Sequence, residues 1–178
     1  MVDANIADDS DVKSDIAYYT ALPVDIEDFI ELPELSDGVI YLVCTAQKPA
    51  QPEKKYVPAY VFDICKGDEK IGDIDLRIGY SGAGPDSSSL YYGGHIGYSI
   101  TEEHRGNEYA VRACRLLLPV AKAHGMSKLI ITNDITNAPS KRVCEKLGAR
   151  FVRTVRLPER SDLYERGQRL SNIFEWTA

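Results

Sequence analysis

The stretch EEHRGNEYAVRACRLLLPVAKAHG, residues 102–125, joins a polar turn to an apolar helix and decides the fold. Its apolar residues recur at helical spacing, which predicts a helix from about residue 107 to 124, ending before Gly125 and kinked at Pro119. A turn of this kind is typical of an anion site, because the first N–H groups of a helix lack intrahelical acceptors. Glu108 is unexpected there, since its carboxylate adds negative charge where a negative ligand would bind.

The residues around this helix predict a mixed, mostly antiparallel α/β (α+β) sheet flanked by helices. Strands are expected over residues 38–47, 56–65, 71–80, 95–100, 127–132, 149–157 and 170–176, and a second helix over 140–148. KGDEK at 66–70 indicates a hairpin turn. Residues 14–38 predict short helices broken at Pro23 and Pro33, and the Gly/Ser-rich residues 81–94 predict a loop, placed over a substrate cleft.

Length and composition indicate one domain. The 178 residues suit a single domain over 16–178, preceded by a flexible acidic tail over 1–15. A net charge of −6 argues against non-specific nucleic-acid binding and leans toward a cationic or neutral substrate. The start lacks a signal-peptide pattern, and no apolar run is long enough for a bilayer, so we expect a cytoplasmic protein without membrane contact. Four dispersed cysteines predict reduced thiols, and the spacing of the histidines gives no metal site.

Two segments, HIGYSITEEHRGNEYA at 95–110 and NAPSKRVCEKLGA at 137–149, resemble the cofactor-binding motifs of the GNAT superfamily of N-acetyltransferases. The first is similar to the family's Gln/Arg-x-x-Gly-x-Gly/Ala turn, in which Arg105 and Ala110 match and Glu108 replaces the central glycine. The second resembles the Asn-x-x-Ser-x-x-x-x-Glu-Lys-Leu-Gly signature of the branch that includes ribosomal-protein alanine acetyltransferases.

The resemblance implies acetyl-CoA as co-substrate. Backbone amides of the turn would hold the pyrophosphate, with Arg105 adding a phosphate contact, and the strand GYSI would pair with the pantetheine and polarise the carbonyl. Because a side chain in the first helical turn can point to solvent, Glu108 should weaken this binding without abolishing it. The implied cofactor-binding residues are Tyr98, Ser99, Ile100, Arg105, Gly106, Asn107, Glu108, Tyr109, Ala110, Asn137 and Ser140.

Three residues are candidates for catalysis. Many family members place a tyrosine where this chain has Cys144, so Ser140 is the first choice to donate a hydrogen bond to the CoA thiolate, and Cys144 is either a donor or a core thiol. His95 opens the strand expected beside the acetyl group and is either the base that takes the proton from the amine or a structural residue.

The acceptor is a primary amine, carried by a small molecule or a peptide N-terminus. Asp73 and Asp75 share one face of a strand, and Tyr91 and Tyr92 follow in the loop, so these four residues are expected to bind it. By position in the family, LPERSDLYERGQR at 157–169 contributes to acceptor choice or to contacts in a homodimer. The alternative function is a non-catalytic acyl-CoA-binding or regulatory module, suggested by Glu108 and the missing tyrosine.

Overall fold

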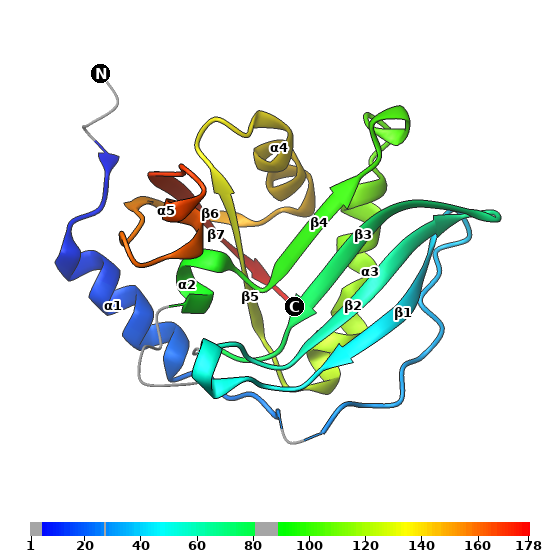
Figure 1. Ribbon diagram of the computed structural model, residues 1–178, viewed down its shortest axis with the longest axis horizontal. Coiled ribbons are helices and arrows are strands. Elements are labelled where there is room, and N and C mark those ends of the chain that lie inside the picture. Colours follow the sequence, from blue (N-terminus) through cyan, green and yellow to red (C-terminus); the bar gives the residue numbers. More distant parts are fainter. Residues whose placement is uncertain (1–4, 27, 81–88) are drawn as a thin grey trace.

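The computed structural model describes residues 5–26, 28–80 and 89–178, and the mixed α/β architecture predicted from the sequence is confirmed (Figure 1). Its elements in chain order are α1 (Asp9–Thr20), β1 (Tyr41–Lys48), the 3-10 helix η2 (Pro52–Lys54), β2 (Ala59–Lys66), β3 (Glu69–Arg77), α2 (Ser89–Gly93), β4 (Ile96–Ile100), the 3-10 helix η3 (Glu102–His104), α3 (Tyr109–Ala123), β5 (Lys128–Asp134), α4 (Ala138–Leu147), β6 (Arg150–Arg156), α5 (Asp162–Glu165) and β7 (Leu170–Thr177).

The strands form two antiparallel sheets, one in the order β1-β2-β3-β4 and the other in the order β5-β7-β6. The predicted hairpin joins β2 to β3, with Lys66 opposite Glu69. Successive residues of β3 alternate between the two faces of the sheet, so Ile74 is buried on one face and Asp73 and Asp75 share the other. The alternation predicted for the two aspartates is therefore confirmed.

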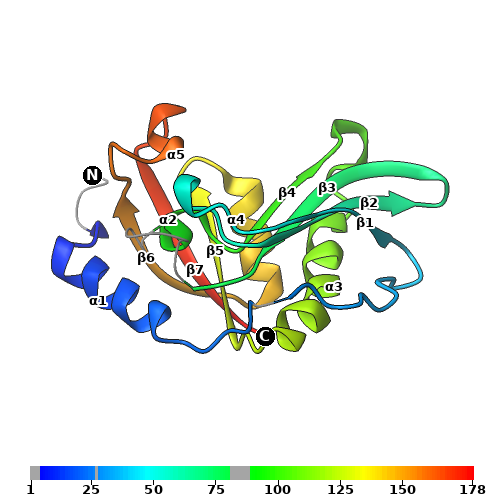
Figure 2. The same cartoon turned by 60° about the horizontal axis from the view of Figure 1, so that its bottom comes forward.

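The two sheets meet at the start of β4 and diverge from there (Figures 1 and 2). At the junction, His95 N donates to Ile130 O over 2.7 Å. Gly94 has a φ of +75°, and a Cβ at this position would lie 3.0 Å from Ile130 O, so only glycine fits the close approach. Beyond this point β4 and β5 belong to different sheets, and α4 lies at the open end of the gap.

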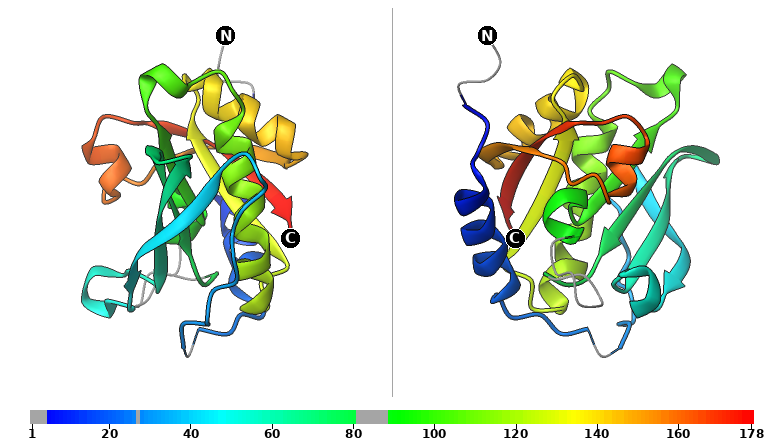
Figure 3. Two further views of the ribbon diagram at one scale, coloured as in Figure 1. Left: turned by 90° about the vertical axis from the view of Figure 1, so that its right-hand side faces the viewer. Right: turned by 60° about the vertical axis from the view of Figure 1, so that its left-hand side comes forward.

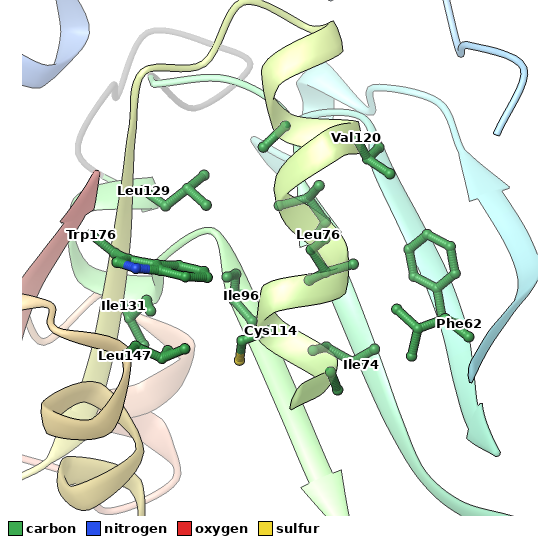
Figure 4. Close-up of a cluster of buried hydrophobic side chains, with 14 of the residues drawn as sticks. Phe62, Ile74, Leu76, Ile96, Cys114, Val120, Leu129, Ile131, Leu147 and Trp176 are labelled. Carbon is green, nitrogen blue, oxygen red and sulfur yellow. The ribbon is translucent and has the colours of Figure 1, made fainter. Parts of the chain in front are cut away.

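Helix α3 packs its apolar face on one face of the first sheet and shares a hydrophobic core with the second sheet (Figures 1 and 3). Its side chains lie between Phe62 and Ile74 of the first sheet and Leu129 and Trp176 of the second (Figure 4). Each fully buried aliphatic side chain there stabilises the fold by about 1.5–3 kcal/mol. Pro119 lies inside the helix, which runs without interruption from Tyr109 to Ala123.

The N-terminal region differs from the prediction. Residues 9–15, expected in a loose tail, form the first part of α1, which begins after the N-cap Asp8. Asp15 accepts hydrogen bonds from Arg153 Nε at 2.6 Å and from Tyr91 Oη at 2.7 Å, and Tyr19 donates to Glu175 at 2.8 Å. These charged and aromatic contacts hold α1 against the second sheet, and single-sequence composition does not reveal them.

The expectations for the connecting segments are met in part. Of the short helices expected over residues 14–38, the one before Pro23 corresponds to the second half of α1, which ends at Thr20. No helix occurs in the described residues of 21–38, where hydrogen bonds such as Ile30 N to Tyr60 Oη, 2.9 Å, hold the chain instead. Residues 81–88 of the predicted loop lie outside the described chain, and residues 89–93 form helix α2. Within the described ranges, no helix is both long enough and apolar enough to cross a bilayer.

All four cysteines are free, as the sequence predicts.

Candidate active site

The turn between β4 and α3 presents backbone N–H groups at the start of a helix. Gly106 has a φ of 80° and Glu108 a φ of 63°, so both residues adopt the left-handed conformation. At this end of α3, Arg112 N donates to Glu108 O over 3.1 Å. The amides of the helical residues before Arg112 are those that a helix start leaves without intrahelical acceptors. Together with the dipole of this 15-residue helix, they favour an anion.

Glu108 keeps its carboxylate away from these amides. Its Oε1 lies 2.6 Å from Lys146 Nζ at the end of α4, and this hydrogen bond lowers the pKa of the Glu108 carboxyl. The backbone at Glu108 has the conformation that glycine adopts most easily, and a left-handed backbone costs other residues about 1–2 kcal/mol. The turn therefore retains a glycine-like shape although a glutamate occupies the position.

Two side chains brace the turn from within. Arg105 Nε donates to Ile100 O over 3.0 Å, and Asn107 Nδ2 donates to His104 O over 3.1 Å and to Arg105 O over 3.2 Å. These bonds hold the turn against the end of β4. The Arg105 side chain is exposed, so a direct contact between its guanidinium group and phosphate stays a prediction.

The free edge of β4 faces the gap between the sheets. Thr101 N donates to Ile71 O, and Ser99 lies opposite Asp73 in the β3–β4 ladder. Alternate residues of an antiparallel strand direct their backbone N–H and C=O groups to opposite sides. The backbone groups of Ser99 therefore face β3, whereas those of Tyr98 and Ile100 face β5. The backbone groups of Tyr98 and the N–H of Ile100 can therefore pair with a ligand in the gap, whereas Ile100 O already accepts from Arg105 Nε. The backbone groups of Ser99, predicted to pair with the cofactor, face β3 instead.

A hydroxyl pair bridges β4 and α4 beside this gap. Tyr98 Oη and Ser140 Oγ lie 3.0 Å apart, and burial raises the pKa of the Tyr98 phenol. Asn137 caps α4, because its Oδ1 accepts from Ser140 N over 3.1 Å. Ser140 thus has a fixed backbone and a hydroxyl partner. The Asn137 side chain is exposed, and its contact with the cofactor stays a prediction.

A cleft of about 740 Å³ opens on the face of the first sheet opposite α3. Its walls come from β2 and β3, the loop around η2, the end of α2 and the segment around α5, and Figure 3 shows α3 and α5 on opposite sides of the sheet. Asp75 lies in this cleft, where a Cβ at Gly97 would come 2.5 Å from its Oδ1. The absence of a side chain at Gly97 therefore brings the Asp75 carboxylate directly beside β4.

Asp75 is the best-placed acid in the cleft. Burial raises the pKa of the Asp75 carboxyl. The positive charges of Arg77, whose guanidinium lies 3.1 Å away, and of Lys48 offset part of this increase. Arg77 is itself held by the carbonyl oxygens of Gly93 and Gly94 at 3.2 and 2.9 Å. A carboxylate with a raised pKa accepts a proton more readily than an ordinary surface aspartate.

Comparison with known proteins identifies the family. Residues 25–150 match the family model described as Acetyltransferase (GNAT) domain, which is more than half of the chain. The chain belongs to the GNAT family. No curated protein matches the sequence.

Solved structures show the same fold. An acetyltransferase from Salmonella typhimurium that modifies an N-terminal serine of a 50S ribosomal subunit protein aligns with a TM-score of 0.51 and 15% identity over 71% of this chain and 66% of its own. The microcin C7 self-immunity acetyltransferase MccE, solved with acetyl-CoA and AMP, gives 0.50 and 15% over 71% and 63%. The ribosomal alpha-N-protein acetyltransferase RimL gives 0.57 and 11% over 87% and 99%. This chain thus spans less than two thirds of the first two proteins.

His95 of this GNAT domain is engaged on both ring nitrogens. Its Nδ1 accepts from Ile130 N over 2.7 Å, so Nε2 carries the proton and donates to Gly79 O. The side chain is fully buried, and desolvation lowers its pKa to about 4. Of the two alternatives for His95, these contacts favour the structural one: it fastens the junction of the sheets and has no nitrogen left to take a proton from an amine.

Cys144 lies in the core of the GNAT domain. The thiol is fully buried on α4, accepts a weak hydrogen bond from Asn133 Nδ2 at 3.6 Å, and has a pKa raised by burial to about 12. This environment favours the core-thiol alternative over donation to a thiolate.

The four predicted acceptor residues do not all reach the cleft. Asp75 and Tyr92 line it. Asp73 is exposed and forms an ion pair with Lys70 at 2.6 Å, and Tyr91 is buried against α1. Asp73 and Tyr91 therefore do not line the cleft.

Sequence reasoning missed the basic residues of the cleft. Arg77 could have been found, since strand alternation places it on the face of Asp75. Lys48, Lys54 and Arg166 come together only through the fold. Sequence reasoning also missed a group formed by the exposed Glu69 and Glu103 and the half-buried His104, whose oxygen and nitrogen atoms lie within 4.8 Å of one another.

Proposed function

We propose that this protein is an acetyl-CoA-dependent N-acetyltransferase that transfers an acetyl group to a primary amine by direct attack in a ternary complex. The observation that carries the proposal is the glycine-like turn of residues 105–110, whose helix-start amides lie next to the free backbone edge of β4. Anion-binding amides beside an unpaired strand edge suit a ligand with a pyrophosphate at one end and an amide-bearing arm at the other. The solved relatives MccE, with acetyl-CoA, and RimL share this fold.

The proposed chemistry begins with acetyl-CoA along β4. A backbone N–H of Tyr98 or Ile100 polarises the thioester carbonyl, and the amine of the acceptor attacks its carbon from the cleft. A C–N bond forms and the tetrahedral intermediate carries the oxyanion. When the intermediate collapses, the C–S bond breaks, and the products are the acetylated amine and CoA.

The acceptor nitrogen loses two protons in this reaction. Asp75 takes the first from the acceptor ammonium before the free amine attacks, directly or through water, because it is the carboxylate beside β4 in the cleft and its pKa is raised. The second proton leaves the nitrogen of the tetrahedral intermediate and ends on the CoA sulfur, and Ser140, paired with the Tyr98 hydroxyl, donates a hydrogen bond to the departing thiolate from the other side of β4. The acceptor amine belongs to a small molecule or to a peptide N-terminus, and a homodimer stays a prediction.

Release of the CoA thiol in the presence of a panel of peptide N-termini and small amines tests the proposal. Asp75→Asn should lower kcat/KM on the best acceptor by about 10²–10⁴-fold and remove the acid limb of the pH profile. Asp73→Asn is the matched control, since Asp73 lies on the same face of β3 but outside the cleft, and it should leave both unchanged. Tight acetyl-CoA binding without transfer to any acceptor would instead identify a non-catalytic acyl-CoA-binding module.

A further inference from the structure

We propose that the cleft selects acceptor peptides that carry acidic residues just after the reacting amine. The inference rests on the proposed function, because it takes the cleft beside Asp75 as the acceptor site. It opposes the expectation from net charge, which favours a cationic or neutral substrate.

The charge of the cleft differs in sign from that of the whole chain. The protein has a net charge of −6, whereas six lysine or arginine side chains and two aspartates line the cleft. The cationic residues are Lys48, Lys54, Lys55, Arg77, Arg160 and Arg166. Concentrating positive charge in a concave region raises the local concentration of anionic ligands and repels cationic ones.

The excess of positive charge is not cancelled within the cleft. Asp75 is matched by Arg77 at 3.1 Å. Across the ranges that the structure describes, Lys48, Lys54 and Arg166 form no ion pair with an acidic side chain. These three cations are therefore available to carboxylates of a bound acceptor.

The layout of the cleft favours a peptide over a small anion. Lys48 ends β1 and Lys54 lies in η2 just after it, whereas Arg166 follows α5, so the cations come from two different walls. A volume of about 740 Å³ lies in the range that encloses a ligand of several linked groups. With the amine held at Asp75, successive side chains of an extended peptide can meet cations on different walls, which a single carboxylate cannot do.

Peptide acetylation measures the selection directly. Three peptides of equal length share the first residue and continue with glutamates, glutamines or lysines, and a free amino acid serves as the small-anion arm. We expect kcat/KM for the glutamate peptide to exceed that for the glutamine peptide by roughly three- to tenfold, with the lysine peptide lowest and the preference falling as salt rises.

Charge reversal in the cleft supplies the second readout. In Lys48→Glu/Lys54→Glu the preference for glutamate over glutamine should vanish or reverse, through a higher KM for the glutamate peptide. Lys66→Glu is the matched control, since Lys66 is exposed at the end of β2 outside the cleft lining, and it should keep the full preference. Circular dichroism checks that the variants are folded.

The possible failures are distinct. Equal kcat/KM for the glutamate and glutamine peptides, or a free amino acid preferred to both, would overturn the selection and leave the acetyltransferase intact. If no amine is acetylated, equilibrium binding of the same peptides still decides the question: tighter binding of the glutamate peptide supports the selection while the proposed transfer fails, and equal binding overturns the selection as well.

Discussion

Glu108 tests whether the backbone of the turn, and not its side chains, makes the pyrophosphate site. Glu108→Gln removes the charge and keeps a side chain, Glu108→Gly removes both and keeps the left-handed conformation, and Glu108→Val disfavours that conformation. The carboxylate points at Lys146, 2.6 Å away, and is exposed to solvent. A unit charge at about 10 Å from an anionic ligand in water changes the Kd of that ligand by roughly twofold, and salt reduces this effect further.

We therefore expect Glu108→Gln and Glu108→Gly to tighten CoA binding by less than about threefold in isothermal titration calorimetry at physiological salt. Glycine relieves left-handed strain but adds freedom to the unfolded chain, so the free energy of unfolding of Glu108→Gly should stay within about 1 kcal/mol of the wild type. In Glu108→Val the β-branched side chain opposes a φ of 63°, which should lower stability by about 1–2 kcal/mol and weaken CoA binding roughly tenfold.

Lys146→Gln completes the series, because it leaves the Glu108 carboxylate unpaired while the turn is unchanged. It should weaken CoA binding modestly, and the double variant with Glu108→Gln should recover part of the loss. A tightening of more than tenfold in Glu108→Gln would refute the reasoning, since the carboxylate would then face the phosphates directly. Unchanged binding in Glu108→Val would refute the requirement for the left-handed turn.

Four other variants test the remaining assignments. His95→Gln should lower the free energy of unfolding by about 2–3 kcal/mol, measured with urea, and leave the acid limb of the pH profile in place, because His95 bonds only to backbone. Ser140→Ala should reduce kcat more than KM, whereas Cys144→Ala should leave acetyl transfer nearly unchanged and lower Tm. Contacts with Lys128 and Tyr19 lower the pKa of Glu175. The stabilisation that the Glu175 carboxylate provides is therefore complete above its unfolded pKa of about 4.3 and is lost as the pH falls through the lower folded pKa. In Glu175→Gln the fall of Tm with decreasing pH below about 5 should be less steep than in the wild type.

Local pattern was sufficient for the part of the fold that holds the cofactor site. The helical spacing after residue 107 predicted α3, and the short helix expected over 140–148 corresponds to most of α4, because both signals depend on residues close in sequence. The turn of residues 105–110 was recognised despite Glu108, since backbone amides do not depend on the side chain. Sheet alternation likewise placed Asp75 on the same face as Asp73.

Contacts between distant segments account for the errors. Asp8–Asp15 reads as a polar tail, yet Asp15 finds Arg153 on β6 and thereby docks a helix. Tyr91 carries the same local signal as Tyr92, and only its packing against α1 separates the two roles. From the sequence, His95 was equally suited to a catalytic and a structural role. The hydrogen bond from Ile130 N, far away in the sequence, favours the structural role.

Successive side chains of β3 and β4 point to opposite faces of the first sheet, so the two faces can carry different parts of the proposed active site. Tyr98 points toward Ser140 on the helix side, whereas Gly97, its neighbour, opens the opposite face to Asp75. In the proposed mechanism acetyl-CoA and the acceptor approach from opposite faces. The edge of β4, which parts from β5 beyond the junction at Gly94 and His95, lies between them. A mutation that moves this junction should impair transfer even when each ligand still binds, because productive attack requires the two reactants to meet across a single strand.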